Sequence, residues 1–103
     1  EDVKLYDIML TFQYLIKNYE EPATHSVAVE EVTLSEQVGF LSGLLQANTK
    51  LSFAGLLEKF ESRLVVVVTF LAILEMLRNR QVKVKQSKLF DDLLISRGST
   101  FGN

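Results

Sequence analysis

The sequence of 103 residues contains no cysteine, no tryptophan, one proline and one histidine. The absence of cysteine excludes disulfides, thiolate metal sites, iron–sulfur clusters and cysteine nucleophiles, and it is typical of a reducing compartment. We therefore expect a cytoplasmic protein. The single histidine, His25, lies in a predicted linker, which favours a solvated side chain over a catalytic one.

The chain also lacks excess charge and long apolar segments. Its 11 Lys and Arg residues against 13 Asp and Glu residues give a net charge of -2, which offers little attraction for phosphate backbones or anionic lipids. The longest apolar run, Leu64–Leu74, is interrupted by Thr69 and is well short of the ~20 residues that a membrane-spanning helix needs. The sequence thus predicts neither a strong DNA-binding protein nor a membrane protein.

Residue patterns for catalysis and nucleotide binding are missing as well. No glycine precedes a Lys-Ser or Lys-Thr pair or opens a helix after a predicted strand, so no phosphate-binding loop is expected. Asp91 and Asp92 are adjacent, and in an extended segment they point to opposite faces, which is a poor placement for a paired acid and base. We expect no catalytic residue, no cofactor and no metal site.

Hydrophobic residues make up 48% of the chain, which is enough for one packed core in a chain too short for two domains. A charged fraction of 23% lies outside the range of disordered proteins. The chain begins at Glu1 without a methionine, so we expect a fragment of a longer protein.

Several segments are predicted to be helices. Apolar residues recur every three or four positions over residues 3–19, which indicates an amphipathic helix. A capping box formed by Thr33 and Glu36 starts a second helix. Ser52 is in position to cap a short third helix, and Ser62 a long fourth one.

The C-terminal part predicts a β-hairpin. Valine and lysine alternate over residues 81–86, and a second apolar run follows at 93–95. Helices closed by such a hairpin form a winged helix, so the predicted fold class is α+β, mainly helical, with a winged-helix domain preceded by an amphipathic N-terminal helix. The predicted division is helix and linker over 1–32, winged-helix domain over 33–96 and flexible tail over 97–103.

The long fourth helix is apolar on two sides. At 100° per residue, one side carries Val65, Thr69, Ala72, Ile73 and Met76, and the other carries Val66, Val67, Phe70, Leu74 and Leu77. Because so small a domain covers one side well but hardly two, the second side predicts a protein partner. The alternative is that the helix at 3–19 folds back over it.

The same helix bears on nucleic-acid binding. Between Leu64 and Leu77 it has no Arg, Lys, Asn or Gln, the residues with which a DNA-reading helix contacts bases. A basic cluster follows it near the predicted hairpin and consists of Arg78, Arg80, Lys83, Lys85 and Lys88. Such a cluster is usually a solvated face and supports at most weak, salt-sensitive contact with DNA.

Gly39 and Gly43 lie four residues apart in the second predicted helix. Each costs ~1 kcal/mol relative to alanine in a helix interior. We therefore expect another helix of the same domain to approach this side closely.

Several segments resemble one protein family. Thr69–Met76, Val82–Gln86 and Phe90–Leu93 are similar to the C-terminal winged helix of segregation and condensation protein A, the kleisin of the bacterial SMC (structural maintenance of chromosomes) complex. Leu5–Asp7 is similar to the helix that precedes that domain. The resemblance covers most of the chain, although Asp91 stands where the family usually has glycine.

The resemblance implies a protein-binding module without enzymatic activity. Such a module docks on the ATPase head of an SMC protein and closes the ring of a chromosome condensation and segregation complex. It implies that the last helix and the wing strands contact the head, and the candidate interface residues are Phe70, Leu74, Val84, Gln86, Phe90 and Asp92.

Further partners and alternatives follow from the same resemblance. It places the N-terminal segment near the region that contacts the segregation and condensation protein B dimer. It implies a cytoplasmic, nucleoid-associated protein that contacts DNA only indirectly or weakly. One alternative is a DNA-binding winged helix of a transcription regulator, which the apolar helix and the acidic pI of about 5.4 disfavour. The other is an enzyme fragment, which the missing catalytic patterns disfavour.

Overall fold

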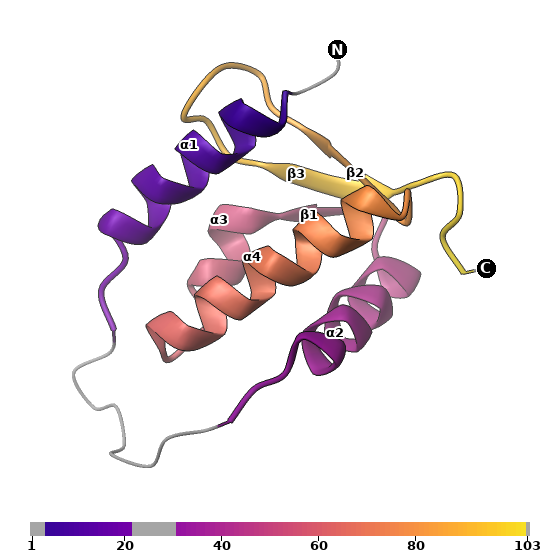
Figure 1. Ribbon diagram of the computed structural model, residues 1–103, viewed down its shortest axis with the longest axis horizontal. Coiled ribbons are helices and arrows are strands. Elements are labelled where there is room, and N and C mark those ends of the chain that lie inside the picture. The colour runs from indigo at the N-terminus through magenta and orange to yellow at the C-terminus, as the bar shows by residue number, and fades with distance from the viewer. Residues whose placement is uncertain (1–3, 22–30, 103) are drawn as a thin grey trace.

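The computed structural model describes residues 4–21 and 31–102. This part of the chain is α+β and mainly helical, as predicted, and Figure 1 shows α4 between α1 and α2, with the strands gathered beside its C-terminal end. The elements in chain order are α1 (Leu5–Lys17), α2 (Leu34–Ala47), β1 (Lys50–Ser52), α3 (Phe53–Leu57), α4 (Arg63–Arg78), β2 (Val82–Lys85) and β3 (Leu94–Arg97).

The three predicted N-caps are present. The Thr33 hydroxyl accepts a hydrogen bond from the Glu36 N–H at 3.1 Å, and the Glu36 carboxylate accepts one from the Thr33 N–H at 2.8 Å. The hydroxyls of Ser52 and Ser62 each accept from the backbone N–H three residues on, at 3.0 and 3.1 Å. Because these bonds satisfy N–H groups that a helix leaves free at its start, the local sequence fixes where α2, α3 and α4 begin.

The sheet has three antiparallel strands in the order β1-β3-β2. The predicted hairpin is confirmed, with Val84 of β2 opposite Ile95 of β3. The strand β1 was not among the sequence predictions, because three residues are too few to show an alternating pattern. It forms by long-range pairing that sets Leu51 opposite Ile95.

The hydrophobic core lies between the helices and one face of the sheet. It includes side chains of five elements that are at most 1% exposed, namely Ile8, Leu41, Phe53, Ile73 and Ile95. Since Ile8 belongs to α1, the N-terminal helix shares the core of the remaining elements. Among the described residues, the predicted boundary at residue 32 therefore marks no break in the core.

The packing of α1 shows that the fold-back alternative is correct. The rings of Phe12 and Phe70 are stacked, with centroids 3.8 Å apart and 10° between their planes. At the other end of α1, the Arg63 guanidinium donates hydrogen bonds to the carbonyls of Ile16 and Tyr19 at 2.7 and 3.0 Å. Ile16 lies in the last turn of α1, whose carbonyls lack the usual i+4 helical N–H partner, and Tyr19 lies two residues beyond the end of the helix.

The middle of the segment predicted as a flexible tail, 97–103, makes specific contacts with the rest of the chain. Thr100 donates from its N–H to the carbonyl of Arg80 at 3.0 Å and from its hydroxyl to that of Asn79 at 2.7 Å. Phe101 packs against the core. The polar residues of this segment predict a frayed chain end. They are instead hydrogen-bonded to the turn between α4 and β2, which lies much earlier in the chain.

The close helix contact expected at Gly39 and Gly43 is also wrong. No described atom comes within 4 Å of a Cβ added at either glycine, and both lie on the exposed side of α2. Most of the predicted linker, including His25, falls on residues 22–30, which lie outside the described ranges.

Candidate protein interaction surfaces

The long helix α4 has a buried side and an exposed side. Phe70 and Ile73 are 4% and 1% exposed and face the core. On the opposite side Leu71 is 49% exposed, and the adjacent Val68 and Leu74 are half-buried. A stripe of aliphatic side chains therefore faces outward in the middle of the helix.

Phe70 does not lie on a free side of α4, contrary to the prediction. Its ring is stacked on Phe12 of α1 and meets Phe53 of α3 edge-on, at a centroid distance of 6.2 Å. Helical periodicity distinguishes two apolar sides of α4, but it does not predict that α1 packs against the second side. Val84, another interface candidate, is only 7% exposed and faces the core from β2.

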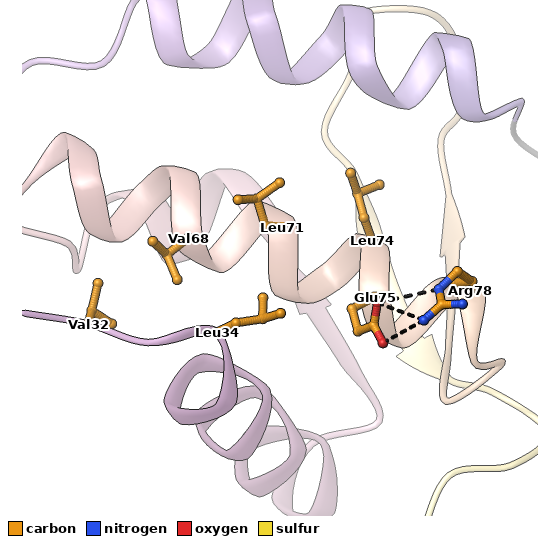
Figure 2. A pocket seen from close by; sticks show the side chains of 7 residues that line it. All are labelled: Val32, Leu34, Val68, Leu71, Leu74, Glu75 and Arg78. Carbon is orange, nitrogen blue, oxygen red and sulfur yellow. Dashed lines mark hydrogen bonds and ion pairs between the residues drawn. The ribbon is translucent and has the colours of Figure 1, made fainter.

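Leu74, in contrast, lines an open groove between α4 and the segment leading into α2. The groove has a volume of about 460 Å³, and Figure 2 shows Val68 of α4 next to Val32 and Leu34, with Leu71, Leu74, Glu75 and Arg78 farther along the same helix. Its lining consists of Val32, Leu34, Val68, Leu71, Leu74, Glu75 and Arg78. We call this surface the α4 groove. Contiguous exposed apolar side chains of this kind mark interaction sites on soluble proteins.

An ion pair forms the polar edge of the α4 groove. Arg78 and Glu75 lie one helical turn apart, with Nη2 and Oε2 separated by 2.9 Å. The hydrogen bond from Arg78 lowers the pKa of the Glu75 carboxyl, and the same contact raises the pKa of Arg78. Since both side chains reach solvent, the pair adds little to stability. An apolar centre with a charged rim is the usual anatomy of a protein interface.

The loop between β2 and β3, which we call the wing because it stands where the predicted wing would lie, presents a second apolar surface. Phe90 has a φ of 71°, in the left-handed region that residues with a Cβ rarely adopt, and it is 46% exposed. Its N–H donates to the Thr11 hydroxyl at 3.2 Å, and its ring centroid lies 5.3 Å from that of Tyr14. Leu89 beside it is 42% exposed. We call Tyr14, Leu89 and Phe90 the wing-tip surface.

Gln86 and Asp92 hold the wing in place from within. The Gln86 amide donates to the Thr11 hydroxyl at 2.5 Å and to the Asp91 carbonyl at 2.9 Å. The Asp92 carboxylate accepts hydrogen bonds from the Ser52 hydroxyl and, at 2.8 Å, from a backbone N–H in the first turn of α3. The sequence-predicted candidates thus divide into core residues, wing supports and two surface residues, Leu74 and Phe90.

The sequence reasoning missed Leu34, Val68 and Leu71. Val68 and Leu71 are three residues apart, and with Leu74 they form an i, i+3, i+6 stripe on a third side of α4. Dividing the helix into only two sides left them out. Leu34 carries no such signal, because it reaches the groove through the packing of α2 on α4.

The described ranges offer little for other site chemistries. Within residues 4–21 and 31–102, no three His, Asp or Glu side chains gather as metal ligands would. No helix in these ranges has the length and apolar character needed to cross a bilayer. Asp91 and Asp92, the only adjacent acids near the wing, are hydrogen-bonded to Ser87 and Ser52.

The chain is similar to known proteins along most of its length. Residues 2–97 match the family model described as segregation and condensation protein ScpA. The chain is 34% identical to segregation and condensation protein A of Bacillus cereus strain AH187 over 98 residues, which cover 92% of this chain and 39% of that protein. The same protein of Bacillus anthracis strain CDC 684 is 35% identical with equal coverage.

A more distant relative comes from another genus. Segregation and condensation protein A of Clostridium acetobutylicum strain ATCC 824 is 28% identical over 105 residues, which cover 96% of this chain and 42% of that protein. The chain therefore spans about two fifths of the length of these curated relatives.

Proposed function

The chain belongs to the segregation and condensation protein A family and corresponds to the C-terminal part of its longer members, and on this premise we propose that it docks on the ATPase head of an SMC protein. Docking closes the ring of a chromosome condensation and segregation complex. The module acts by binding and not by catalysis. Its place is the cytoplasm, in association with the nucleoid.

The order of elements supports a winged helix as the docking module. From α2 to β3 the chain runs helix, strand, helix, helix, strand, strand, and the last two strands form the hairpin that serves as the wing. In a DNA-reading winged helix, α4 would be the recognition helix. In this chain the helix at that place in the fold lines one side of the α4 groove.

The observation that carries the proposal is the exposure of Leu71 and its neighbours in the α4 groove. A DNA-binding α4 would present Arg, Lys, Asn or Gln to base edges, whereas its exposed stripe is Val68, Leu71 and Leu74. Aliphatic side chains gain free energy when a protein surface covers them. This favours a protein partner over the alternative of a transcription regulator.

Two of the sequence-predicted candidates are assigned direct contact with the head, Leu74 in the α4 groove and Phe90 at the wing tip. The other four act indirectly. Phe70 and Val84 keep α4 and β2 in place, and Gln86 and Asp92 hold the wing. The N-terminal segment is the one we assign to the segregation and condensation protein B dimer.

Charge substitutions in the groove test the proposal. Leu71→Arg and Leu74→Arg each place a charge where the head would cover it, and burying an unpaired charge costs several kcal/mol. We expect the affinity for the cognate SMC head to fall at least ~100-fold for each variant, which is about 2.7 kcal/mol. Isothermal titration calorimetry with the purified head measures this.

Leu64→Arg is the matched control. Leu64 is 48% exposed on the first turn of the same helix but does not line the groove. Its affinity should stay within ~3-fold of the unchanged chain, because an exposed charge remains hydrated. Head binding that survives both groove substitutions, in variants that unfold at the same temperature as the unchanged chain, would contradict docking through α4.

A further inference from the structure

The three-stranded sheet has a second face that the core does not use. Along each strand side chains alternate between buried and outward positions, with Leu51, Val82, Val84 and Ile95 turned inward. The outward positions carry the exposed lysines Lys50, Lys83 and Lys85. We call these three lysines and the outward residues between them the lysine face.

The register of the sheet places the three lysines around one centre. Ser96 of β3 is paired with Lys50 on one side and with Lys83 on the other. At ~4.8 Å between strands, Lys50 and Lys83 stand about 10 Å apart across the sheet. Lys83 and Lys85 are two residues apart on β2, about 7 Å along the strand.

The charge of this face is uncompensated within the described residues. The strands β1, β2 and β3 contain no Asp or Glu. In residues 4–21 and 31–102 none of the three lysines has a carboxylate within 4 Å, and the nearest acids of the wing accept hydrogen bonds from serine hydroxyls. Three like charges held this close repel one another, so an anionic ligand would be favoured there.

The lysine face and the α4 groove are separate surfaces. The buried side of α4 and the buried side of the sheet both face the core. The outward stripe of α4 and the outward side of the sheet therefore both point away from the core. None of the three lysines lines the groove.

We propose that the lysine face binds the phosphate backbone of duplex DNA without reading its sequence. Each DNA strand carries one charge per ~3.4 Å of helix axis, and this dense row of phosphates offers partners to lysines that lie about 7 to 10 Å apart. Lysine ammonium groups on flexible stems suit phosphates as point charges. The face offers no forked arginine pair for reading guanine, which agrees with backbone contact alone.

An acidic protein surface is less well matched to the lysine face. Specific protein interfaces are anchored by apolar or aromatic side chains in pockets. Leu94, which is 40% exposed, is the only apolar side chain among the outward positions of the three strands. Charge complementarity without such an anchor is typical of contact with a polyanion.

Salt dependence gives the proposal a quantitative test. Fluorescence anisotropy with a labelled duplex of about 20 base pairs follows the binding constant of the 103-residue chain from low to physiological salt. Neutralising three phosphates predicts a slope of log K against log salt near -2.7, which means about 40-fold weaker binding at 200 mM than at 50 mM salt. The double variant Lys83→Gln with Lys85→Gln should reduce the slope to about -0.9.

A matched double variant is the control. Lys17→Gln with Lys59→Gln removes the same charge from exposed positions outside the sheet, on α1 and in the turn after α3, and it should keep the slope near -2.7. An unchanged slope in Lys83→Gln with Lys85→Gln, an equal loss in the control, or sequence-specific binding at physiological salt would each overturn the proposal. All variants should unfold at the same temperature, because every substituted side chain is solvent-exposed.

A second titration separates DNA from an acidic protein surface. The same double variants are measured against the purified SMC head. If Lys83→Gln with Lys85→Gln weakens salt-dependent head binding and leaves DNA binding unchanged, the lysine face binds protein and the DNA proposal is wrong. Since the DNA titration does not involve the head, failure of the docking proposal leaves this one intact.

Discussion

Phe70 and Leu71 are neighbours in α4 with opposite environments. The Phe70 ring is 4% exposed between α1 and α3, whereas Leu71 is 49% exposed in the α4 groove. Because Phe70 contacts aromatic rings of two other helices, its truncation leaves a cavity that the surrounding rings cannot fill. Leu71 leaves no cavity, because solvent already reaches it.

This contrast gives a stability prediction for the two residues. Phe70→Ala should lower the free energy of unfolding by about 3–5 kcal/mol, and Leu71→Ala by no more than ~0.5 kcal/mol. Urea denaturation followed by circular dichroism provides both values, with the slopes of the two transitions compared as a check on the denatured state. Equal losses would show that Leu71 is part of the core and that the α4 groove is not an open surface.

At the scale of elements, Thr11 connects α1 to the wing. Its side chain is fully buried, and its hydroxyl accepts hydrogen bonds from the Gln86 amide and from the N–H of Phe90. The second bond holds the strained backbone of Phe90, whose φ is 71°. The position of the wing-tip surface thus depends on a residue 79 positions earlier in the chain.

Thr11→Val tests this connection with little change in side-chain volume. The substitution removes one of the two acceptors of the Gln86 amide and the acceptor of the Phe90 N–H, and unsatisfied polar groups of this kind cost about 1–3 kcal/mol. We expect that loss in chemical denaturation, together with faster hydrogen exchange at the Phe90 amide. Thr49→Val, at an exposed position just before β1, is the control and should change neither quantity.

The elements that the sequence predicts are those fixed by local interactions. The caps at Thr33, Ser52 and Ser62 act within a single turn, and the alternation over 81–86 reflects which side of β2 is buried. The strand β1 depends instead on pairing with β3, more than 40 residues away. A strand of three residues is too short to show the alternating pattern from which such pairing is predicted.

The candidate site was predictable to a similar extent. Helical periodicity indicates that α4 has more apolar surface than the predicted domain at 33–96 can bury by itself. Leu74, one of the predicted interface residues, lines the α4 groove. It could not tell which side α1 covers, because this depends on the match between Phe12 and Phe70 across two distant helices. For the same reason the sequence predicts Phe70 as an interface residue and does not identify Leu71 as one.

At the scale of the whole molecule, α1 closes the core. Ile8 is 1% exposed, and Phe12 covers rings of both α3 and α4. A chain shortened to begin at residue 31 would expose Phe53 and Phe70, which are 0% and 4% exposed in the intact chain. Small domains have little stability to spare for such a loss.

We therefore expect the shortened chain to lose cooperative unfolding. Calorimetry should show a broad or absent transition, and a hydrophobic dye should bind the shortened chain and not the intact one, as for states with loosened packing. An equally sharp transition without dye binding would mean that α1 is dispensable for the core. That result would free α1 to leave the domain when a partner binds.

The strand order has a consequence for synthesis in the cell. Among the described elements the central strand β3 is the last to leave the ribosome, and both β1 and β2 have their sheet hydrogen-bonding partner only in β3. Until residues 94–97 have emerged, the capped helices are complete but the three-stranded sheet described above cannot form. Folding of this domain is thus delayed until translation has passed its final strand, and a ribosome stalled before that point holds a chain whose core is open on the sheet side.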